Sequence, residues 1–232
     1  MDYGSATMSL FAVLAALNCR KRTGIGQDVD LASREVPSCF IGDSLMDYIM
    51  NGRNDHRDGN RDAVMAPHNC YPCQGEDAWI SIAVSNEDEW SALCRAIGDP
   101  SWAKEERFAD MLSRWKNQEE LDKLIGKWTV GHPPYEAMHV LQKVGVAAFP
   151  SMTGKDIFTD PHIADRGFAP VVDHPLIGKQ VVVALPFKLS VTPGKVTRHA
   201  PMIGEHNSYV LGDLLGLTDK EIKSLIEEEV VC

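Results

Sequence analysis

An aspartate stands at the start of the first long apolar segment of this 232-residue chain. Asp2 is followed by Leu10, Val13, Leu14 and Leu17, whose spacing of three and four residues predicts one face of a helix beginning near Asp2. A carboxylate there can cap exposed backbone amides. Aspartate side chains are in general ionised at neutral pH, and carboxylates form covalent intermediates in some enzymes, so this residue type can do chemistry as well as cap a helix. The two roles are compatible.

A second pair of reactive residues, Cys70 and Cys73, has the C-x-x-C spacing of redox and zinc sites. Thioredoxin-type chemistry needs the first cysteine at a helix start, whereas the run from Trp79 to Val84 predicts a strand soon after the pair. A zinc site needs a second ligand pair at a recognisable spacing, which we do not find. We therefore expect structural thiols and no metal site.

Composition and charge restrict the class of protein. Apolar residues make up 44% of the chain and charged residues 24%, as in soluble globular proteins. The formal net charge of -10 argues against binding to nucleic acid or to an anionic membrane. No apolar stretch approaches the roughly 18 residues that span a bilayer. The six cysteines are widely spaced and no secretion signal precedes them, so we expect reduced thiols and a cytoplasmic protein.

The elements that must position Asp2 are predicted to be a helix, a strand and a second helix. The first helical pattern stops at Gly24, because glycine readily takes the left-handed conformation that ends helices. Residues Gln27 to Leu31 then alternate polar and apolar side chains, as a half-buried strand does. Ser33 to Met50 returns to helical spacing. This order is typical of an α/β fold.

The rest of the chain is predicted to be a loop followed by mixed helices and strands. Asn51 to Ala66 is polar and lacks an apolar period, so it reads as a linker. The expected strands are 70–74, 79–84 and 181–184, with a turn at 75–77, and the expected helices are 87–97, 118–128, 135–143 and 205–215. A final helix is predicted from Thr218, because Glu221 three residues later has capping-box spacing.

Three blocks of sequence, in the same order and spacing, resemble the family III CoA-transferases, also called the CaiB/BaiF or formyl-CoA and carnitine CoA-transferase family. The first surrounds the aspartate that serves as nucleophile in that family, the second resembles its small-domain hairpin and the third its closing segment. These blocks are residues 2–30, residues 65–80 and residues 200–217. The resemblance covers nearly the whole chain and corresponds to the carboxy-terminal portion of the family fold.

This resemblance implies an enzyme that moves coenzyme A between an acyl thioester and a free carboxylate. Asp2 matches the nucleophile, which would pass through a mixed anhydride and an aspartyl-CoA thioester. Coenzyme A thioester would be a substrate, and no permanently bound cofactor is expected. The main contacts to coenzyme A in this family come from an amino-terminal half that this sequence lacks, so we expect the site to be completed by that half or by another polypeptide.

The resemblance also implies a domain arrangement and an assembly. Residues 1–50 would be a segment of the large domain that carries the nucleophile, 51–66 a linker, 67–150 an inserted small α+β domain, and 151–232 the return linker and closing segment. Members of the family form interlocked dimers. We therefore expect either a homodimer or a complex with an amino-terminal-half polypeptide.

Substrate specificity is predicted to depend on the stretch that leads into the first strand of the small domain. The oxalate-specific branch has a glycine-rich loop where this sequence has Ala66-Pro67-His68-Asn69-Cys70, so oxalate is disfavoured as acceptor and a medium or branched acid is favoured. His68 and Asn69 are the candidate substrate-binding residues, although a loop histidine can equally be a simple surface residue.

Two alternatives stay open. An α-methylacyl-CoA racemase shares the fold and the aspartate at Asp2, but needs a base on each face of the α-carbon, one of them a small-domain glutamate. The carboxylate near Ser85-Asn86-Glu87 does not clearly match that glutamate. A non-catalytic subunit of a CoA-transferase complex would keep the fold and the assembly without needing Asp2.

Overall fold

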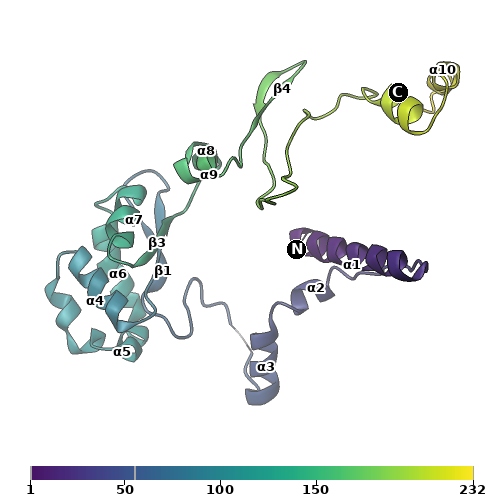
Figure 1. Ribbon diagram of the computed structural model, residues 1–232. Helices are drawn as coiled ribbons and strands as arrows, with labels where there is room; N and C mark the ends of the chain where they lie inside the picture. Colours follow the sequence, from purple (N-terminus) through teal and green to yellow (C-terminus); the bar gives the residue numbers. More distant parts are fainter. Residues whose placement is uncertain (1, 55, 232) are drawn as a thin grey trace.

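The computed structural model describes residues 2–54 and 56–231 (Figure 1). One compact unit, built between β1 and β3, holds almost all of the buried apolar side chains. The segments before and after this unit extend away from it and carry helices that pack against little else in the chain. The architecture is mixed α/β, as the sequence predicted.

The compact unit is organised on a three-stranded antiparallel sheet in the order β1-β2-β3. The strands are β1 (His68–Pro72), β2 (Trp79–Ala83) and β3 (Ala147–Pro150). The predicted turn between β1 and β2 is confirmed: Gly75 and Asp77 both have positive φ there. Side chains of a strand alternate between faces, so Ile80 and Ile82 point to the buried face while Ser81 points to the open one.

Helices cover only one face of this sheet. They are α4 (Glu87–Ala96), η1 (Ser101–Lys104), η2 (Glu106–Phe108), α5 (Met111–Lys116), α6 (Gln118–Thr129) and α7 (Pro134–Gln142). Their apolar sides place Leu93, Phe108, Leu121, Ile125 and Leu141 in the core at 0% exposure. The three long helices predicted in this region are confirmed, and the opposite face of the sheet is left uncovered.

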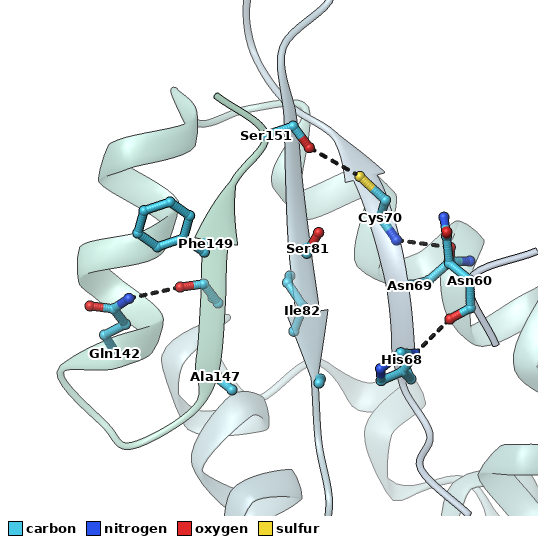
Figure 2. A pocket seen from close by; sticks show the side chains of 12 residues that line it. Asn60, His68, Asn69, Cys70, Ser81, Ile82, Gln142, Ala147, Phe149 and Ser151 are labelled. Atoms are coloured by element: carbon cyan, nitrogen blue, oxygen red, sulfur yellow. Dashed lines mark hydrogen bonds between the residues drawn. The ribbon is translucent and has the colours of Figure 1, made fainter. Parts of the chain in front are cut away.

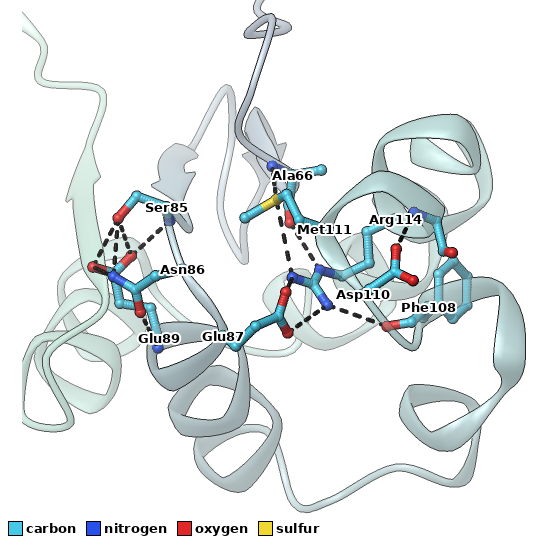
Figure 3. Close-up of polar contacts among 10 residues, drawn as sticks. Ala66, Ser85, Asn86, Glu87, Glu89, Phe108, Asp110, Met111 and Arg114 are labelled. Atoms are coloured by element: carbon cyan, nitrogen blue, oxygen red, sulfur yellow. Dashed lines mark hydrogen bonds and ion pairs between the residues drawn. The ribbon is translucent and has the colours of Figure 1, made fainter.

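Arg114 on α5 joins three parts of the compact unit (Figure 3). Its guanidinium is fully buried and donates to the backbone carbonyls of Ala66, at 3.1 Å, and Phe108, at 3.2 Å. It also forms a two-pronged ion pair with Glu87 at 2.6 and 3.0 Å, and lies 4.6 Å from the centre of the Trp90 ring. A buried cation is tolerated only when its donors are satisfied, as they are here.

The amino-terminal segment contains α1 (Asp2–Thr23), α2 (Glu35–Ser38) and α3 (Gly42–Asn51). The predicted helix from 33 to 50 is therefore divided in two. The predicted strand at Gln27 to Leu31 is wrong: these residues form no strand, because no described residue provides the pairing backbone that a strand requires. The contact between α1 and α2 is made by Val36, which lies against Gly4.

Apolar side chains in this segment are unusually exposed. On α1, Leu10, Leu14 and Leu17 are between 46% and 59% exposed, and Phe11, on another side of the helix, is 69% exposed. A helix that is apolar on several sides is normally buried. The whole chain exposes 17026 Å², whereas a compact monomer of this size exposes about 10,000 Å². The apolar faces of these segments suit burial against another surface, and the described part of this chain does not provide that surface.

The carboxy-terminal segment begins with α8 (Gly154–Thr159) and α9 (Pro161–Asp165), followed by a hairpin of β4 (Val171–His174) and β5 (Gly178–Val181). The strand predicted at 181–184 thus starts and ends earlier, although Val182 and Ala184 still donate backbone hydrogen bonds across the hairpin. The predicted helix at 205–215 is the short π-helix η3 (Ser208–Leu214). The capping box at Thr218 is confirmed at the start of α10 (Asp219–Glu227).

None of the helices in the described part of the chain is long and apolar enough to cross a membrane.

We predict that Arg114→Met lowers the free energy of unfolding of the compact unit by about 3 kcal/mol, because it leaves two buried carbonyls without donors and removes the ion pair. Urea denaturation followed by tryptophan fluorescence measures this change. Arg107→Met is the matched control: Arg107 pairs with Glu105 and Glu120 at the surface, so its loss should cost much less than the loss of Arg114. Equal losses in both variants would contradict the role of Arg114.

Candidate functional site

Asp2 lies in the first turn of α1, as predicted, with an exposed side chain. No hydrogen bond or ion pair from another described residue engages its carboxylate. The 22-residue helix continues without interruption to Thr23, and its last turn carries Arg20, Lys21 and Arg22, which suit the negative end of the helix. The carboxylate therefore has no partner among residues 2–54 and 56–231 and lies at the positive end of a long helix.

Ser5 lies one helical turn after Asp2 and was not singled out from the sequence. Its hydroxyl oxygen is buried and has no hydrogen-bond partner among the described residues. Residues three apart on a helix share a face, so this hydroxyl lies on the same side as Asp2. An unpaired buried hydroxyl is unfavourable.

His68 and Asn69 are neighbours on β1, so their side chains leave the strand on opposite faces. The His68 Nδ1 lies 2.6 Å from the carbonyl oxygen of Asn60. Because a carbonyl can only accept, Nδ1 carries the proton and Nε2 remains for another partner. His68 is therefore oriented by the linker rather than free to rotate.

The Asn69 side chain is fully engaged within the protein. Its amide nitrogen donates to Asp122 on α6 at 2.7 Å, and its oxygen accepts from the backbone of Cys70 at 2.8 Å. Tyr71 donates to the same Asp122 carboxylate at 2.6 Å, and burial together with that charge holds the pKa of Tyr71 well above its usual range. The binding role of Asn69 stays a prediction, and here it holds β1 against α6.

The open face of the sheet forms a groove, which we call the open-face groove, with a volume of about 700 Å³ (Figure 2). The strand register places three side chains in each of two neighbouring rows: His68, Ala83 and Ala147 in one, and Cys70, Ser81 and Phe149 in the other. The alternating pattern at 79–83 could have revealed the polar Ser81. The sequence indicates short strand-like runs from Val146 onward but does not single out a strand at 147–150, so it did not reveal the groove.

The two cysteines of the C-x-x-C pair are both free thiols. The Cys70 sulfur lies in the groove, 3.6 Å from the Ser151 hydroxyl, whereas Cys73 is buried in the core. Burial, and to a smaller extent Cys70, raises the pKa of Cys73, which makes it a poor nucleophile at neutral pH. The other described cysteines are also free, and Cys232 lies outside the described residues.

Two glutamates at the start of α4 are committed to structure (Figure 3). Glu89 accepts from the backbone N–H of Ser85 at 2.7 Å and from the Asn86 amide at 2.8 Å, and these bonds, the backbone one foremost, lower the pKa of Glu89. Glu87 is held by Arg114. A carboxylate with a lowered pKa is a weak base, so Glu89 is not arranged to remove a proton from substrate. Both carboxylate oxygens of Glu87 accept from Arg114, so Glu87 is engaged as well.

A third polar cluster joins the β4–β5 hairpin to the closing segment. Glu205 accepts from the backbone N–H of Met202 at 2.7 Å and lies 3.3 Å from the Nε2 of His199. These contacts lower the pKa of Glu205. The backbone hydrogen bond lowers it most, and the charge interaction with His199 is the next largest lowering effect.

Within the described residues, no group of three or more His, Cys, Asp or Glu side chains is arranged to hold a metal ion.

The structure places Asp2 and His68 in different parts of the chain. Figure 1 shows α1 standing apart from the compact unit, joined to it by α2, α3 and the linker. The single chain therefore does not bring the predicted nucleophile and the predicted substrate-binding residues into one cavity.

Comparison with known proteins gives a consistent result. A family model described as CoA-transferase family III matches residues 1–207. The chain is 32% identical to a succinyl-CoA–D-citramalate CoA-transferase of Chloroflexus aurantiacus, over 99% of this chain and 57% of that protein. It is 31% identical to a succinyl-CoA:mesaconate CoA-transferase of Haloarcula marismortui, over 91% and 52% respectively.

A crystal structure of a CaiB/BaiF family protein from Brucella suis has a similar fold, with a TM-score of 0.77 and 28% identity. The match covers 90% of this chain and 54% of that one. The chain thus spans about half the length of these relatives.

We predict that Glu89→Gln destabilises the protein by about 1 kcal/mol at pH 7, because the amide replaces a charged hydrogen-bond acceptor. The pKa of Glu89 is lowered by folding, so this contribution is present above the unfolded-state pKa and is lost as the pH falls through the folded-state value. Denaturation curves at pH 7 and below about pH 4 should show the difference shrinking. Asp88→Asn, an exposed neighbour in the same turn, is the control; a Glu89 effect independent of pH would contradict the assignment.

Proposed function

Because this chain belongs to CoA-transferase family III, we propose that it transfers coenzyme A between an acyl-CoA thioester and a carboxylic acid. The observation that carries the proposal is the exposed, unengaged carboxylate of Asp2 in the first turn of α1. Coenzyme A enters and leaves as a substrate, and the proposal needs no permanently bound cofactor. The named relatives act on carboxylic acids and their CoA thioesters.

Asp2 is the nucleophile in this proposal. Its carboxylate oxygen attacks the thioester carbon, the C–S bond breaks, and CoA leaves as thiolate, so that a mixed anhydride remains on the enzyme. The thiolate then attacks the aspartyl carbonyl and releases the donor acid as carboxylate, giving an aspartyl-CoA thioester. The acceptor carboxylate repeats these two steps in reverse. No proton transfer is required, which suits a site with no general base beside Asp2.

The start of α1 favours these steps. The first backbone N–H groups of a helix have no partner within the helix and carry partial positive charge. They can stabilise the oxyanion that forms when the thioester or the aspartyl carbonyl is attacked. The unpaired Ser5 hydroxyl on the same side adds a neutral donor.

A complete site requires more than these residues. The chain spans about half the length of its relatives, and we propose that the part matching their remaining sequence, in this or a second polypeptide, supplies the main contacts to coenzyme A. A dimer would cover the exposed apolar faces of α1 and α3 and bring His68 to the nucleophile. Residues 67–150 would then act as the small domain, in a cytoplasmic enzyme.

The racemase alternative is weakened by the two glutamates of α4. A racemase needs a small-domain carboxylate free to accept a proton from the α-carbon. Glu89 is engaged by Ser85 and Asn86, and Glu87 by Arg114. A non-catalytic subunit remains the other alternative, and it differs from the proposal in not needing Asp2.

We predict that Asp2→Asn abolishes acyl transfer, by about 10³-fold or more, while leaving the fold unchanged. The protein is assayed together with the polypeptide or segment matching the amino-terminal half of its relatives. Hydroxylamine added during turnover should convert Asp2 of the wild type to a hydroxamate, which peptide mass spectrometry locates.

Asp28→Asn, which removes another exposed aspartate, is the matched control and should keep both activity and the Asp2 hydroxamate. Full activity in Asp2→Asn would identify a non-catalytic subunit. Exchange of the α-hydrogen for deuterium without acyl transfer would identify a racemase.

We predict that the protein is an oligomer in solution, because the exposed apolar faces of α1 and α3 are shaped for burial. Light scattering coupled to gel filtration measures its mass. Leu14→Glu should shift the mass toward the monomer, whereas Asn18→Glu, at an already polar position of α1, should not. A monodisperse wild-type monomer would contradict the proposed assembly.

A further inference from the structure

The open-face groove has a floor of small side chains. Ser81, Ala83 and Ala147 occupy neighbouring positions on the uncovered face of the sheet, where most strand residues of this unit are larger. The floor follows β2 from Trp79 to Ala83, which corresponds to about 13 Å at the usual rise of a strand. The ring of Phe149, which is 48% exposed, lies at the β3 side of this floor (Figure 2). A slender chain can lie along the floor beside this ring.

The two long sides of the groove differ in chemistry. The β1 side carries His68 and the Cys70 thiol, which is hydrogen-bonded to the Ser151 hydroxyl. The β3 side carries Ala147, the ring of Phe149 and Gln142 of α7, whose amide nitrogen donates to the Ala148 carbonyl at 2.8 Å. An occupant that matches both sides is apolar along its length and tolerates a hydroxyl or carbonyl on one edge.

No side chain that lines the groove, as far as the structure describes it, carries a fixed charge. Charged residues make up 24% of the whole chain, so this is a distinct property of the groove. A carboxylate placed here would lose hydration without gaining a cation, whereas an aliphatic chain would gain from burial.

We propose that the open-face groove binds the acyl chain of the thioester substrate and selects an uncharged aliphatic chain over one that ends in a second carboxylate. This inference rests on the proposed function and names the substrate class of that site. It separates this chain from the relatives named for succinyl-CoA, whose acyl group carries a second carboxylate.

Direct binding to the full chain tests the groove without requiring turnover. Hexanoyl-pantetheine and succinyl-pantetheine are titrated separately into isotope-labelled protein, and backbone amide shifts are recorded by NMR. We expect hexanoyl-pantetheine to shift the amides of Ser81, Ala83 and Ala147 and to bind about tenfold more tightly than the succinyl compound. Equal affinity, tighter succinyl binding, or shifts confined to other regions would overturn the proposal.

Two variants examine the same site with opposite expectations. Ser81→Phe fills the floor at an exposed strand position and should weaken hexanoyl-pantetheine binding about tenfold, whereas Ser91→Phe on α4 should not change it. Ala147→Lys places a cation in the groove and should shift the preference toward succinyl-pantetheine. If neither variant changes either affinity, the groove is not the acyl site.

Failure of this inference is distinguishable from failure of the proposed function. The hydroxamate at Asp2 reports acyl transfer whatever binds the acyl chain. If the wild type forms the hydroxamate but neither Ser81→Phe nor Ala147→Lys changes pantetheine-thioester binding, the transferase assignment stands and the groove is rejected as the acyl site. A protein without the hydroxamate that still binds hexanoyl-pantetheine in the groove would reject the transferase assignment alone.

Discussion

Apolar burial is concentrated between Tyr71 and Ala148, and the rest of the structure depends on this imbalance. The three-stranded sheet buries one face beneath its helices, and Arg114 fastens the start of β1 to α4 and η2. This unit is a stable platform because its core is complete within one stretch of sequence. The flanking segments have apolar faces but no core of their own, so their arrangement depends on surfaces beyond those of the single chain.

The division has a consequence for catalysis. Asp2, the proposed nucleophile, lies on α1, which has no residue classed as buried, and the groove proposed for the acyl chain lies on the compact unit. The proposed reaction requires both, so we propose that assembly brings them together and links catalysis to oligomerisation. In this proposal the reactive groups meet only when the complex forms, which limits unproductive hydrolysis of the thioester by water.

The polar residues of the compact unit divide into those that stabilise and those that remain available. Three carboxylates accept hydrogen bonds from groups of the protein itself. Asp122 accepts from Tyr71, Glu87 from Arg114, and Glu89 from the backbone N–H of Ser85. His68 and Ser81 instead face the open side of the sheet, where no helix covers them. These three carboxylates are thus not free to act as bases. The residues on the open side of the sheet are suited to recognising a ligand by shape and hydrogen bonding. The proposed nucleophilic chemistry belongs to Asp2.

Local pattern determined much of this protein. The helix that begins at Asp2, the β1–β2 hairpin and the capping box at Thr218 were predictable, because spacing, turn residues and capping act over a few neighbours. Tertiary structure alone decided the rest. The alternation at 27–31 did not become a strand because pairing needs a distant partner. The open-face groove exists only because β3 pairs with β2, although Ala148 follows its partner Ile82 by 66 positions in the sequence. Such long-range pairing leaves no signal within either segment.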